Sequence, residues 1–468
     1  MSDAKSTWRF PREFWSANLV ELFERMAYYA IFIELALYLT RNYEFSDVHA
    51  GWAAAYLAAF IYLVPTFAGA LADRIGFRKA LIMAFGLLTA GYGLLGLFGM
   101  PAVKEAIGVS AAKSTVVLSL SLILLGGSFV KPIISGTVAK ASDENNRARA
   151  FSIFYMVVNI GAFIGKTLAH PLRTQLGLEY VAFYSSLMGL CGLLVVLAFY
   201  RGVDRKGEGK SYAEIGRGLV KVMGNFRFLA LIPIVGGFWT IQGQLYASMP
   251  KYVLRTVGEQ AKPEWIANIN PAVVVILVVP ITQLVRRLAP VTSIGIGLFI
   301  IPLSALTISF SPLLEEAFGR EMTLLGISTH AITITLCTGI ALQGLAECFL
   351  SPRFLEYASK QAPPGEEGLY MGYSHLTTFF AWLFGFAISG YLLDAYCPDP
   401  KTLPADQLEV YRQAMETGGT LPQAYADAHY IWYVFAGIGF VAFACLVVFA
   451  LVTRRIDRRR AARDPATS

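Results

Sequence analysis

The first apolar segment of the chain carries a group of ionisable side chains that could do chemistry. It reads Glu-Leu-Phe-Glu-Arg-Met-Ala-Tyr-Tyr at residues 21–29. At about 100° per residue, one side of such a helix would carry Glu21, Glu24, Arg25, Tyr28 and Tyr29. A charge at membrane depth is costly and usually faces a bundle interior or a watery cavity. We therefore expect this stripe to form a cavity wall; the alternative is an internal salt-bridge network that only holds the helix.

Two lone charges in other apolar segments point to the same kind of cavity. Lys131 and Glu347 each lie in an otherwise apolar stretch, one in each half of the chain, and Gln343, Glu347 and Ser351 share one helical face. Unpaired, each charge would cost several kcal/mol. Two unit charges about 4 Å apart gain about 4 kcal/mol at an effective dielectric of about 20. The two side chains could pair with each other, and a zwitterionic ligand could replace both partners.

The composition predicts the elements that position these groups. Of 468 residues, 56% are hydrophobic and 15% are charged, and the mean hydropathy is +0.54. Soluble domains carry about 25% charged residues, and a spanning helix needs about 20 mostly apolar ones. We expect an all-α membrane protein with twelve spanning helices, centred near residues 27, 62, 89, 127, 160, 190, 238, 275, 302, 339, 382 and 441.

Charge placement predicts the topology and the domains. Lys and Arg gather in alternate short loops, in a polar segment at 201–227 and in the last fifteen residues, as they do on the cytoplasmic side of membrane proteins. Both termini are therefore expected in the cytoplasm, with no cleaved signal peptide. The polar segment divides the chain into an N-terminal six-helix bundle (1–200), a cytoplasmic linker (201–227) and a C-terminal six-helix bundle with a basic tail (228–468). We assign no function to the polar outer segment near 395–428.

The same features argue against other classes of protein. The net charge is +7, but the basic residues cluster beside the ends of apolar segments, which argues against nucleic-acid binding. Five scattered cysteines are too few for a disulfide framework or a metal site. No nucleophile–base pair and no phosphate-binding loop has usable spacing. We expect no enzyme activity, no cofactor and no metal, and a chain that works as a monomer.

The loop after the second segment resembles the signature of the major facilitator superfamily. Residues 69–79 read Gly-Ala-Leu-Ala-Asp-Arg-Ile-Gly-Phe-Arg-Lys. The resemblance implies a fold of two six-helix bundles and a gating role for Asp73, Arg74, Arg78 and Lys79. The alternative is that the basic residues only enforce orientation.

Several further motifs resemble the proton-dependent oligopeptide transporter family. Residues 21–29 match its E-x-x-E-R-F-x-Y-Y pattern with Met26 replacing Phe, and residues 154–161 resemble F-Y-x-x-I-N-x-G. Weaker matches are Phe-Val-Lys-Pro at 129–132, Asn270-Pro271, Glu347 followed by Ser351-Pro352, and Gln361-Ala362-Pro363.

The resemblance implies roles for individual residues. Arg25 and Lys131 would meet a substrate carboxylate, and Glu347 would meet an amino group. Proton coupling would involve Glu21, Glu24, Arg25 and Glu347. The predicted substrate site comprises Arg25, Tyr28, Tyr29, Tyr62, Lys131, Tyr155, Asn159, Trp239, Gln242, Asn270, Glu347, Ser351, Ser374 and His375.

Three positions depart from the family's pattern. The seventh segment has Gln242 and Gln244 where relatives usually offer a carboxylate, so protons would have to use the remaining acids. Phe32 replaces a common basic residue, and Ser374-His375 replaces a Trp that commonly shapes the side-chain pocket. The linker also lacks the extra hydrophobic helix pair of many bacterial members.

Three other ionisable residues are interpreted without a transport role. We expect Glu34 to be a packing or rim residue, because it lies opposite the stripe and near the outer end of its helix. We expect Lys166 to be a rim charge. His375 is expected to be a satisfied core histidine.

The leading hypothesis is a proton-coupled symporter in the cell membrane that imports di- and tripeptides or similar small zwitterions by alternating access. Its partners would be that substrate, protons and the lipid bilayer. One alternative is a major facilitator carrier for a non-peptide metabolite or drug, with proton antiport or efflux as its mode. A non-transporting nutrient sensor is a remote alternative, since the linker and tail are too short for a signalling domain.

Overall fold

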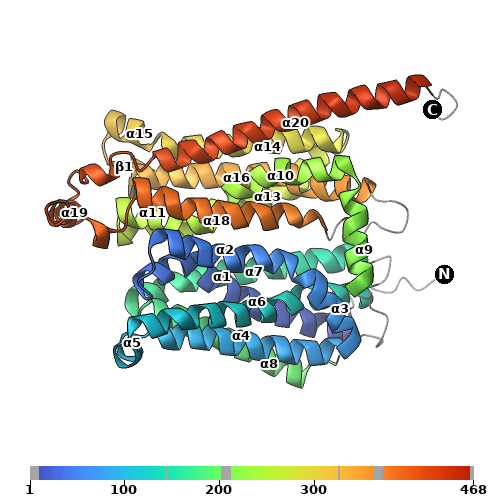
Figure 1. Ribbon diagram of the computed structural model, residues 1–468, viewed down its shortest axis with the longest axis horizontal. Helices are drawn as coiled ribbons and strands as arrows, with labels where there is room; N and C mark the ends of the chain where they lie inside the picture. The colour runs from blue at the N-terminus through green and yellow to red at the C-terminus, as the bar shows by residue number, and fades with distance from the viewer. Residues whose placement is uncertain are drawn as a thin grey trace. The chain divides into compact units, whose positions relative to one another are not determined.

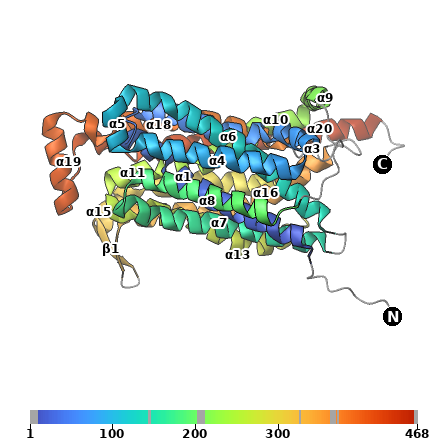
Figure 2. The same ribbon diagram turned by 90° about the horizontal axis from the view of Figure 1, so that it is seen from below.

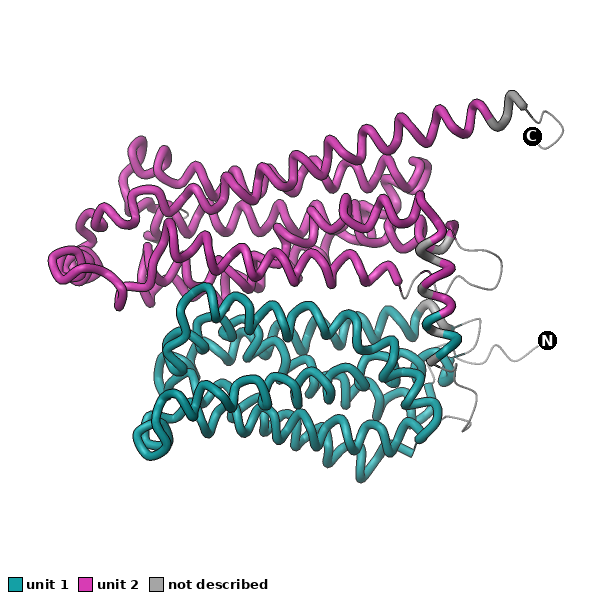
Figure 3. Tube along the Cα trace, viewed as in Figure 1, with its two compact units in different colours: residues 1–216 teal, residues 217–468 magenta. Residues whose placement is uncertain are grey.

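A computed structural model describes residues 10–142, 146–201, 212–324, 327–361, 370 and 373–463. The chain divides into two compact units, Met1–Gly216 and Arg217–Ser468 (Figure 3). In each unit, long helices lie side by side (Figures 1 and 2).

The first unit is built from helices of very different lengths. These are α1 (Arg12–Arg41), α2 (Asp47–Leu63), α3 (Pro65–Ile75), α4 (Phe77–Gly99), α5 (Pro101–Ile107), α6 (Val109–Lys140), α7 (Arg147–Gln175) and α8 (Leu178–Ala198). Helix α9 (Tyr212–Met223) falls in the predicted linker and spans the boundary between the units.

The second unit adds short outer elements to its long helices. Its α-helices are α10 (Phe226–Ala247), α11 (Met249–Thr256), α12 (Pro263–Ile266), α13 (Ile269–Leu284), α14 (Pro290–Ser309), α15 (Ser311–Phe318), α16 (Ala331–Lys360), α18 (Leu376–Tyr396), α19 (Ala405–Thr417) and α20 (Tyr430–Arg463). Its 3-10 helices are η1 (Glu259–Ala261), η2 (Pro400–Thr402) and η3 (Gln423–Tyr425). Strands β1 (Glu321–Leu324) and β2 (Ile327–His330) form an antiparallel pair that the sequence patterns did not predict.

The long helices confirm an all-helical architecture suited to a membrane. Within the described residues, ten helices are long and apolar enough to cross a bilayer, and eleven if α2 and α3 form one span. These two helices are bent by 52°. The bend falls at Pro65, whose ring removes a backbone donor and clashes with the preceding turn.

Helix α1 is missing from that count because of its composition. It is 30 residues long and carries Glu21, Glu24, Arg25 and Glu34 in its interior. Three of these four charged residues, Glu21, Glu24 and Arg25, are the ones predicted to take part in proton coupling.

Glycines allow the helices of the first unit to approach closely. A Cβ on Gly161 of α7 would lie 2.7 Å from Arg25 Cβ, and one on Gly165 would lie 2.5 Å from Met26 O. Small residues four apart are a common device for close packing of membrane helices. The Gly161-x-x-x-Gly165 pair therefore fixes α7 against the charged turn of α1.

A glycine with a positive φ separates α3 from α4. Gly76 adopts φ +93°, a conformation that residues with a Cβ rarely adopt. Gly76 caps the end of α3 and the start of α4, within the 69–79 motif. The positive φ that this turn requires is the physical reason for a glycine at this position of the motif.

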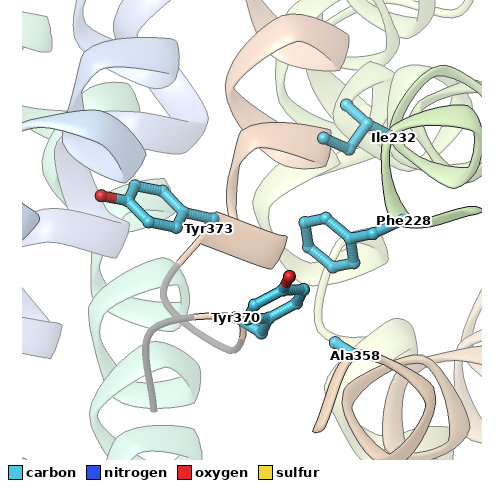
Figure 4. Packing of buried hydrophobic residues seen from close by; sticks show 5 residues of the cluster. All are labelled: Phe228, Ile232, Ala358, Tyr370 and Tyr373. Carbon is cyan, nitrogen blue, oxygen red and sulfur yellow. The ribbon is translucent and has the colours of Figure 1, made fainter. Parts of the chain in front are cut away.

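An aromatic cluster in the second unit joins α10 and α16 to two tyrosines that precede α18. Figure 4 shows its members, which are Phe228, Ile232, Ala358, Tyr370 and Tyr373. The rings of Phe228 and Tyr370 lie 5.3 Å apart in an edge-to-face arrangement. Because Ser374 and His375 follow Tyr373 directly, this packing anchors the start of α18 where two predicted site residues lie.

Candidate functional site

The charged turn of α1 forms the centre of the candidate site in the first unit. Arg25 Nε lies 3.3 Å from Glu21 Oε1, and the same guanidinium pairs with Glu24 through Nε and Nη2. Both carboxylates are buried, with 1% of each residue exposed. Glu21 Oε2 and Glu24 Oε1 accept no hydrogen bond from the described residues. One guanidinium therefore serves two buried carboxylates, and the trio carries a formal charge of −1 when both are ionised.

Aromatic rings complete the surroundings of Arg25. Its Cζ atom lies 5.2 Å from the ring centre of Tyr28 and 5.7 Å from that of Tyr29. Such distances allow cation–π attraction. Phe32, at the position where relatives often carry a base, stacks on Tyr28 with ring centres 4.8 Å apart. The departure from the family's pattern thus replaces a charge with ring packing that holds Tyr28 beside Arg25.

Lys131 of α6 belongs to the same electrostatic environment. It lies close enough to interact with Glu21, Glu24 and Arg25 across the unit, yet it is exposed. A ligand could therefore reach Lys131 without entering the buried trio. The structure brings together the two cations that were predicted to meet a carboxylate.

The other predicted residues of the first unit lie on helices around this cluster. Tyr62 of α2 is half-buried, and Tyr155 of α7 is exposed. Asn159 is half-buried, and its Nδ2 donates to Tyr155 O of its own helix at 2.8 Å.

Three predicted residues meet in the second unit. Gln242 Nε2 of α10 donates to Glu347 Oε2 of α16 at 3.1 Å, and Asn270 Nδ2 of α13 donates to the same oxygen at 3.5 Å. Helices from three parts of the sequence therefore converge on one carboxylate. The amide of Gln242, which replaces the family's acid, acts as a neutral donor to Glu347.

Unused acceptors surround this carboxylate on α16. Three buried oxygen atoms accept no hydrogen bond from the described residues: Gln242 Oε1, Gln343 Oε1 and Ser351 Oγ. A buried acceptor costs free energy unless a donor reaches it. The stripe of Gln343, Glu347 and Ser351 therefore suits a ligand rich in N–H groups.

The remaining predicted residues of the second unit are buried or half-buried. Trp239 is half-buried and packs edge-to-face on Phe238 with ring centres 5.2 Å apart. Ser374 is buried, and His375 is the half-buried N-cap of α18. Neither contacts Glu347 in any described interaction.

One arginine of the predicted gating motif makes hydrogen bonds inside the first unit. Arg78 donates from Nε to Tyr200 O at 3.0 Å and from Nη2 to Leu197 O at 2.9 Å. These carbonyls lie at the C-terminal end of α8, where a cation is favourable. Arg74 and Lys79 are exposed, and Asp73 is half-buried.

Sequence reasoning missed a second charged group between α1 and α7. Arg173 Nε lies 3.3 Å from Glu34 Oε1, and both side chains are almost fully buried. Lys166 is only 1% exposed, so its interpretation as a rim charge is wrong. Its Nζ lies 5.8 Å from the ring centre of Tyr29. The spacing of Lys166, His170 and Arg173 on one helical face was the signal that could have revealed this group.

Metal chemistry finds no support in the described part of the chain. There, no group of three or more His, Cys, Asp or Glu side chains could hold a metal ion.

Comparison with known proteins places this architecture in a family. A sequence profile described as Major Facilitator Superfamily matches residues 18–319. The chain belongs to the Major Facilitator Superfamily. Superfamily membership and the apolar helices confirm that it is a multi-pass membrane transporter and not an enzyme.

The curated relatives are distant, and they include multidrug resistance proteins and peptide permeases. The multidrug resistance protein MdtH of Cronobacter sakazakii is 24% identical over 74% of this chain and 79% of its own length. The dipeptide and tripeptide permease A of Escherichia coli is 23% identical over 86% of this chain and 88% of its own length.

Solved structures share the fold over nearly the whole chain. A peptide transporter POT in complex with sulfate has a TM-score of 0.69 and 20% identity, and the match covers 96% of this chain and 95% of that one. A POT family transporter in complex with 5-aminolevulinic acid has a TM-score of 0.66 and 19% identity, covering 95% and 97%. The resemblance to peptide transporters is thus confirmed for the fold.

Proposed function

We propose that the chain is a proton-coupled symporter that imports di- and tripeptides or similar small zwitterions. The observation that carries the proposal is the buried trio of Glu21, Glu24 and Arg25, in which two carboxylates share one guanidinium. A buried charge without a full complement of partners is costly. Binding one proton would remove the excess negative charge, which gives the trio a reason to titrate during transport.

The chemistry of each unit suits one end of a zwitterion. In the first unit, Arg25 and Lys131 supply positive charge for a carboxylate. In the second, Glu347 supplies negative charge for an ammonium group, and the amides of Gln242 and Asn270 orient it. The 5-aminolevulinic acid named for one structural neighbour is itself a small zwitterion.

The glutamine in α10 supports a proton coupling that uses carboxylates of α1 and α16. Gln242 cannot titrate, so the candidate proton carriers among the predicted residues are Glu21, Glu24 and Glu347. The driving force is adequate, because one charge moving through about 100 mV supplies about 2.3 kcal/mol. One pH unit adds about 1.4 kcal/mol.

The proposal includes the topology predicted from the sequence. With α1 added to the ten apolar helices and the bent α2–α3 pair, the chain would cross the membrane twelve times, with both termini cytoplasmic. At about 1.5 Å per residue, α1 is about 45 Å long, which exceeds a hydrocarbon core of about 30 Å. The bundles would comprise residues 1–200 and 228–468, joined by the 201–227 linker, and the chain would act as a monomer.

Uptake into proteoliposomes tests the proposal. With an inward proton gradient, vesicles that contain the protein should accumulate labelled dialanine above the external concentration, and a protonophore should abolish the accumulation. Protein-free vesicles and vesicles without a gradient are the controls. If no di- or tripeptide accumulates under a gradient, the peptide assignment is wrong.

A second candidate is a carrier for a non-peptide metabolite or drug, moved in exchange for protons. It is favoured by the absence of an acid at Gln242 and by the Ser374-His375 pair. Names of distant relatives such as MdtH agree with it. A thermal-shift panel of peptides, amino acids and amphiphilic cations distinguishes the two candidates, because only the second predicts stabilisation by the cations alone.

A further inference from the structure

The last turns of α20 form a basic surface that the proposed transport does not use. In Figure 1, α20 runs past the ends of the other long helices of the second unit. The helix has 34 residues, which corresponds to about 51 Å at about 1.5 Å per residue. A hydrocarbon core of about 30 Å accounts for about 20 residues. About four turns therefore extend beyond it.

An ion pair marks the level at which α20 leaves the helix bundle. Arg227, the second residue of α10, pairs with Asp457 of α20. Since α10, which is long and apolar enough to cross a bilayer, begins there, we place the end of the membrane-spanning part of the second unit near this level. The residues beside Asp457 therefore lie at the depth of the lipid headgroups.

The same pair also fixes which face of α20 points away from the bundle. Ala442, Leu446 and Phe449 are buried, and at about 100° per residue Asp457 continues their side of the helix. The opposite side is apolar and exposed through Val448, Leu451 and Val452, at 60%, 52% and 43%. In a membrane, this exposed side meets the acyl chains.

Arginines continue that exposed side directly. Arg454, Arg455, Arg458 and Arg459 are all exposed. At about 100° per residue, their directions fall within an arc of about 140°, which also holds Val448 and Leu451, and Val452 lies about 20° beyond its edge. Asp457, the acid among them, pairs with Arg227 of α10, although 56% of its side chain is exposed. A lipid-facing apolar stripe therefore ends in four cations at headgroup depth.

We propose that this arginine face binds the phosphate groups of anionic phospholipids in the leaflet where α20 ends. A guanidinium forms two parallel hydrogen bonds with a phosphate, and its apolar stem can lie along the acyl chains. A role limited to membrane orientation needs only positive charge in this region. It does not need the cations to share one lipid-facing arc while the nearby acid pairs with Arg227 on another side of the helix.

Matched double variants of the full chain test the proposal. R458Q/R459Q removes two charges from the surface, and K401Q/R412Q removes two from exposed side chains elsewhere in the second unit. Each protein is purified from mixed phosphatidylcholine and phosphatidylglycerol, and native mass spectrometry counts the retained lipids. We expect R458Q/R459Q to reduce retained phosphatidylglycerol several-fold, and K401Q/R412Q to match the wild type.

Further measurements separate the alternatives. Added inorganic phosphate should not displace the lipid, because the apolar stripe contributes to lipid binding only. Raising the salt concentration should weaken retention in the wild type, which tests the proposal even if a variant folds poorly. Equal phosphatidylglycerol retention by both double variants, or no preference for it in the wild type, would overturn the proposal. Peptide uptake is not the readout, so failure here leaves the proposed transport untouched.

Discussion

Glu34 of α1 and Arg173 of α7 form an ion pair inside the first unit, with Arg173 Nε 3.3 Å from Glu34 Oε1 and at most 3% of either side chain exposed. Together with the close approach at Gly161 and Gly165, it joins the same two helices that hold the Glu21–Arg25 cluster. One helix interface therefore carries two charged groups, of which only one has a proposed part in proton coupling.

Removing one partner of this pair should destabilise the protein strongly. A buried charge left alone costs about 3–5 kcal/mol, whereas replacing both partners by apolar residues is often much milder. We expect R173M to lower the melting temperature far more than the double variant E34L/R173M. Thermal unfolding in one detergent measures both. The exposed Arg412–Glu409 pair is the control, and R412M should have little effect because exposed pairs contribute little. Equal losses in both Arg173 variants would contradict this account.

The glycine contacts predict that small enlargements of α7 disturb the site. In G165A, the new Cβ would approach Met26 O to 2.5 Å, so the helices must separate. Such overpacking costs about 1–3 kcal/mol, and it would move α7 away from the turn that holds Arg25. We expect lower thermal stability and slower peptide uptake. G86A is the matched control, because nothing lies within 4 Å of its Cβ and alanine favours a helix. Normal uptake by G165A would argue against this positioning role.

Neutralising one carboxylate of the trio should separate exchange from accumulation. In E24Q, Arg25 and Glu21 balance each other, so no excess charge remains to bind a proton. We expect loss of gradient-driven accumulation, with counterflow of labelled peptide partly retained. The control is E105Q, which alters an exposed residue of α5. Unchanged pH-dependent accumulation by E24Q would exclude Glu24 as an essential proton site.

Restoring an acid in α10 should alter the pH dependence of transport. In Q242E, a second carboxylate would lie about 3 Å from Glu347, where the amide now donates at 3.1 Å. Two carboxylates so close cannot both remain ionised, and one must hold a proton. We expect uptake by Q242E to fall more steeply than that of the wild type as the pH rises. Q242L, which removes the amide without adding an acid, is the comparison. Identical pH profiles for Q242E and the wild type would contradict the contact.

The sequence predicted which side chains share a face of one helix better than it predicted contacts between helices. Glu21, Glu24 and Arg25 could be placed on one helical face because the period of a helix is regular, and Glu347 was conspicuous as a charge among apolar residues. The meeting of Gln242, Asn270 and Glu347 depends on packing among three helices that no local pattern encodes. For the same reason Lys166 was assigned to the rim, although α7 buries it beside Tyr29.

Boundaries and outer elements were the least predictable parts of the fold. The apolar run near residue 62 indicated one span, but Pro65 divides it into α2 and α3. The β1–β2 hairpin is two strands of four residues, too short for a reliable alternation of polar and apolar side chains. Its last residue nevertheless caps α16, the helix that carries Glu347.

That cap predicts a pH-dependent stability. Ile332 N–H donates to His330 Nδ1 at 3.2 Å, so the ring must be neutral at that atom. Burial and the nearby Arg320 lower the pKa of His330 below its usual value of about 6.5, and Glu321 opposes the shift. Glu315 Oε1 lies 3.9 Å from Nδ1, a weak attraction for a protonated ring. The unfolded chain therefore takes up the proton first, and His330 should reduce stability as the pH falls from about 7 through its lowered pKa.

Two variants isolate the histidine from its neighbour. In H330N, the side-chain oxygen can replace Nδ1 as acceptor without titrating, so we expect the loss of melting temperature between about pH 7 and about pH 5 to become smaller. Burial raises the pKa of Glu315, with Arg320 opposing the shift, so this carboxyl favours the folded state at low pH and loses that contribution as the pH rises. E315Q should therefore make the acid-side loss steeper, opposite in sign to H330N. Thermal melts across this range measure both, and parallel curves for H330N and the wild type would show that the cap does not titrate.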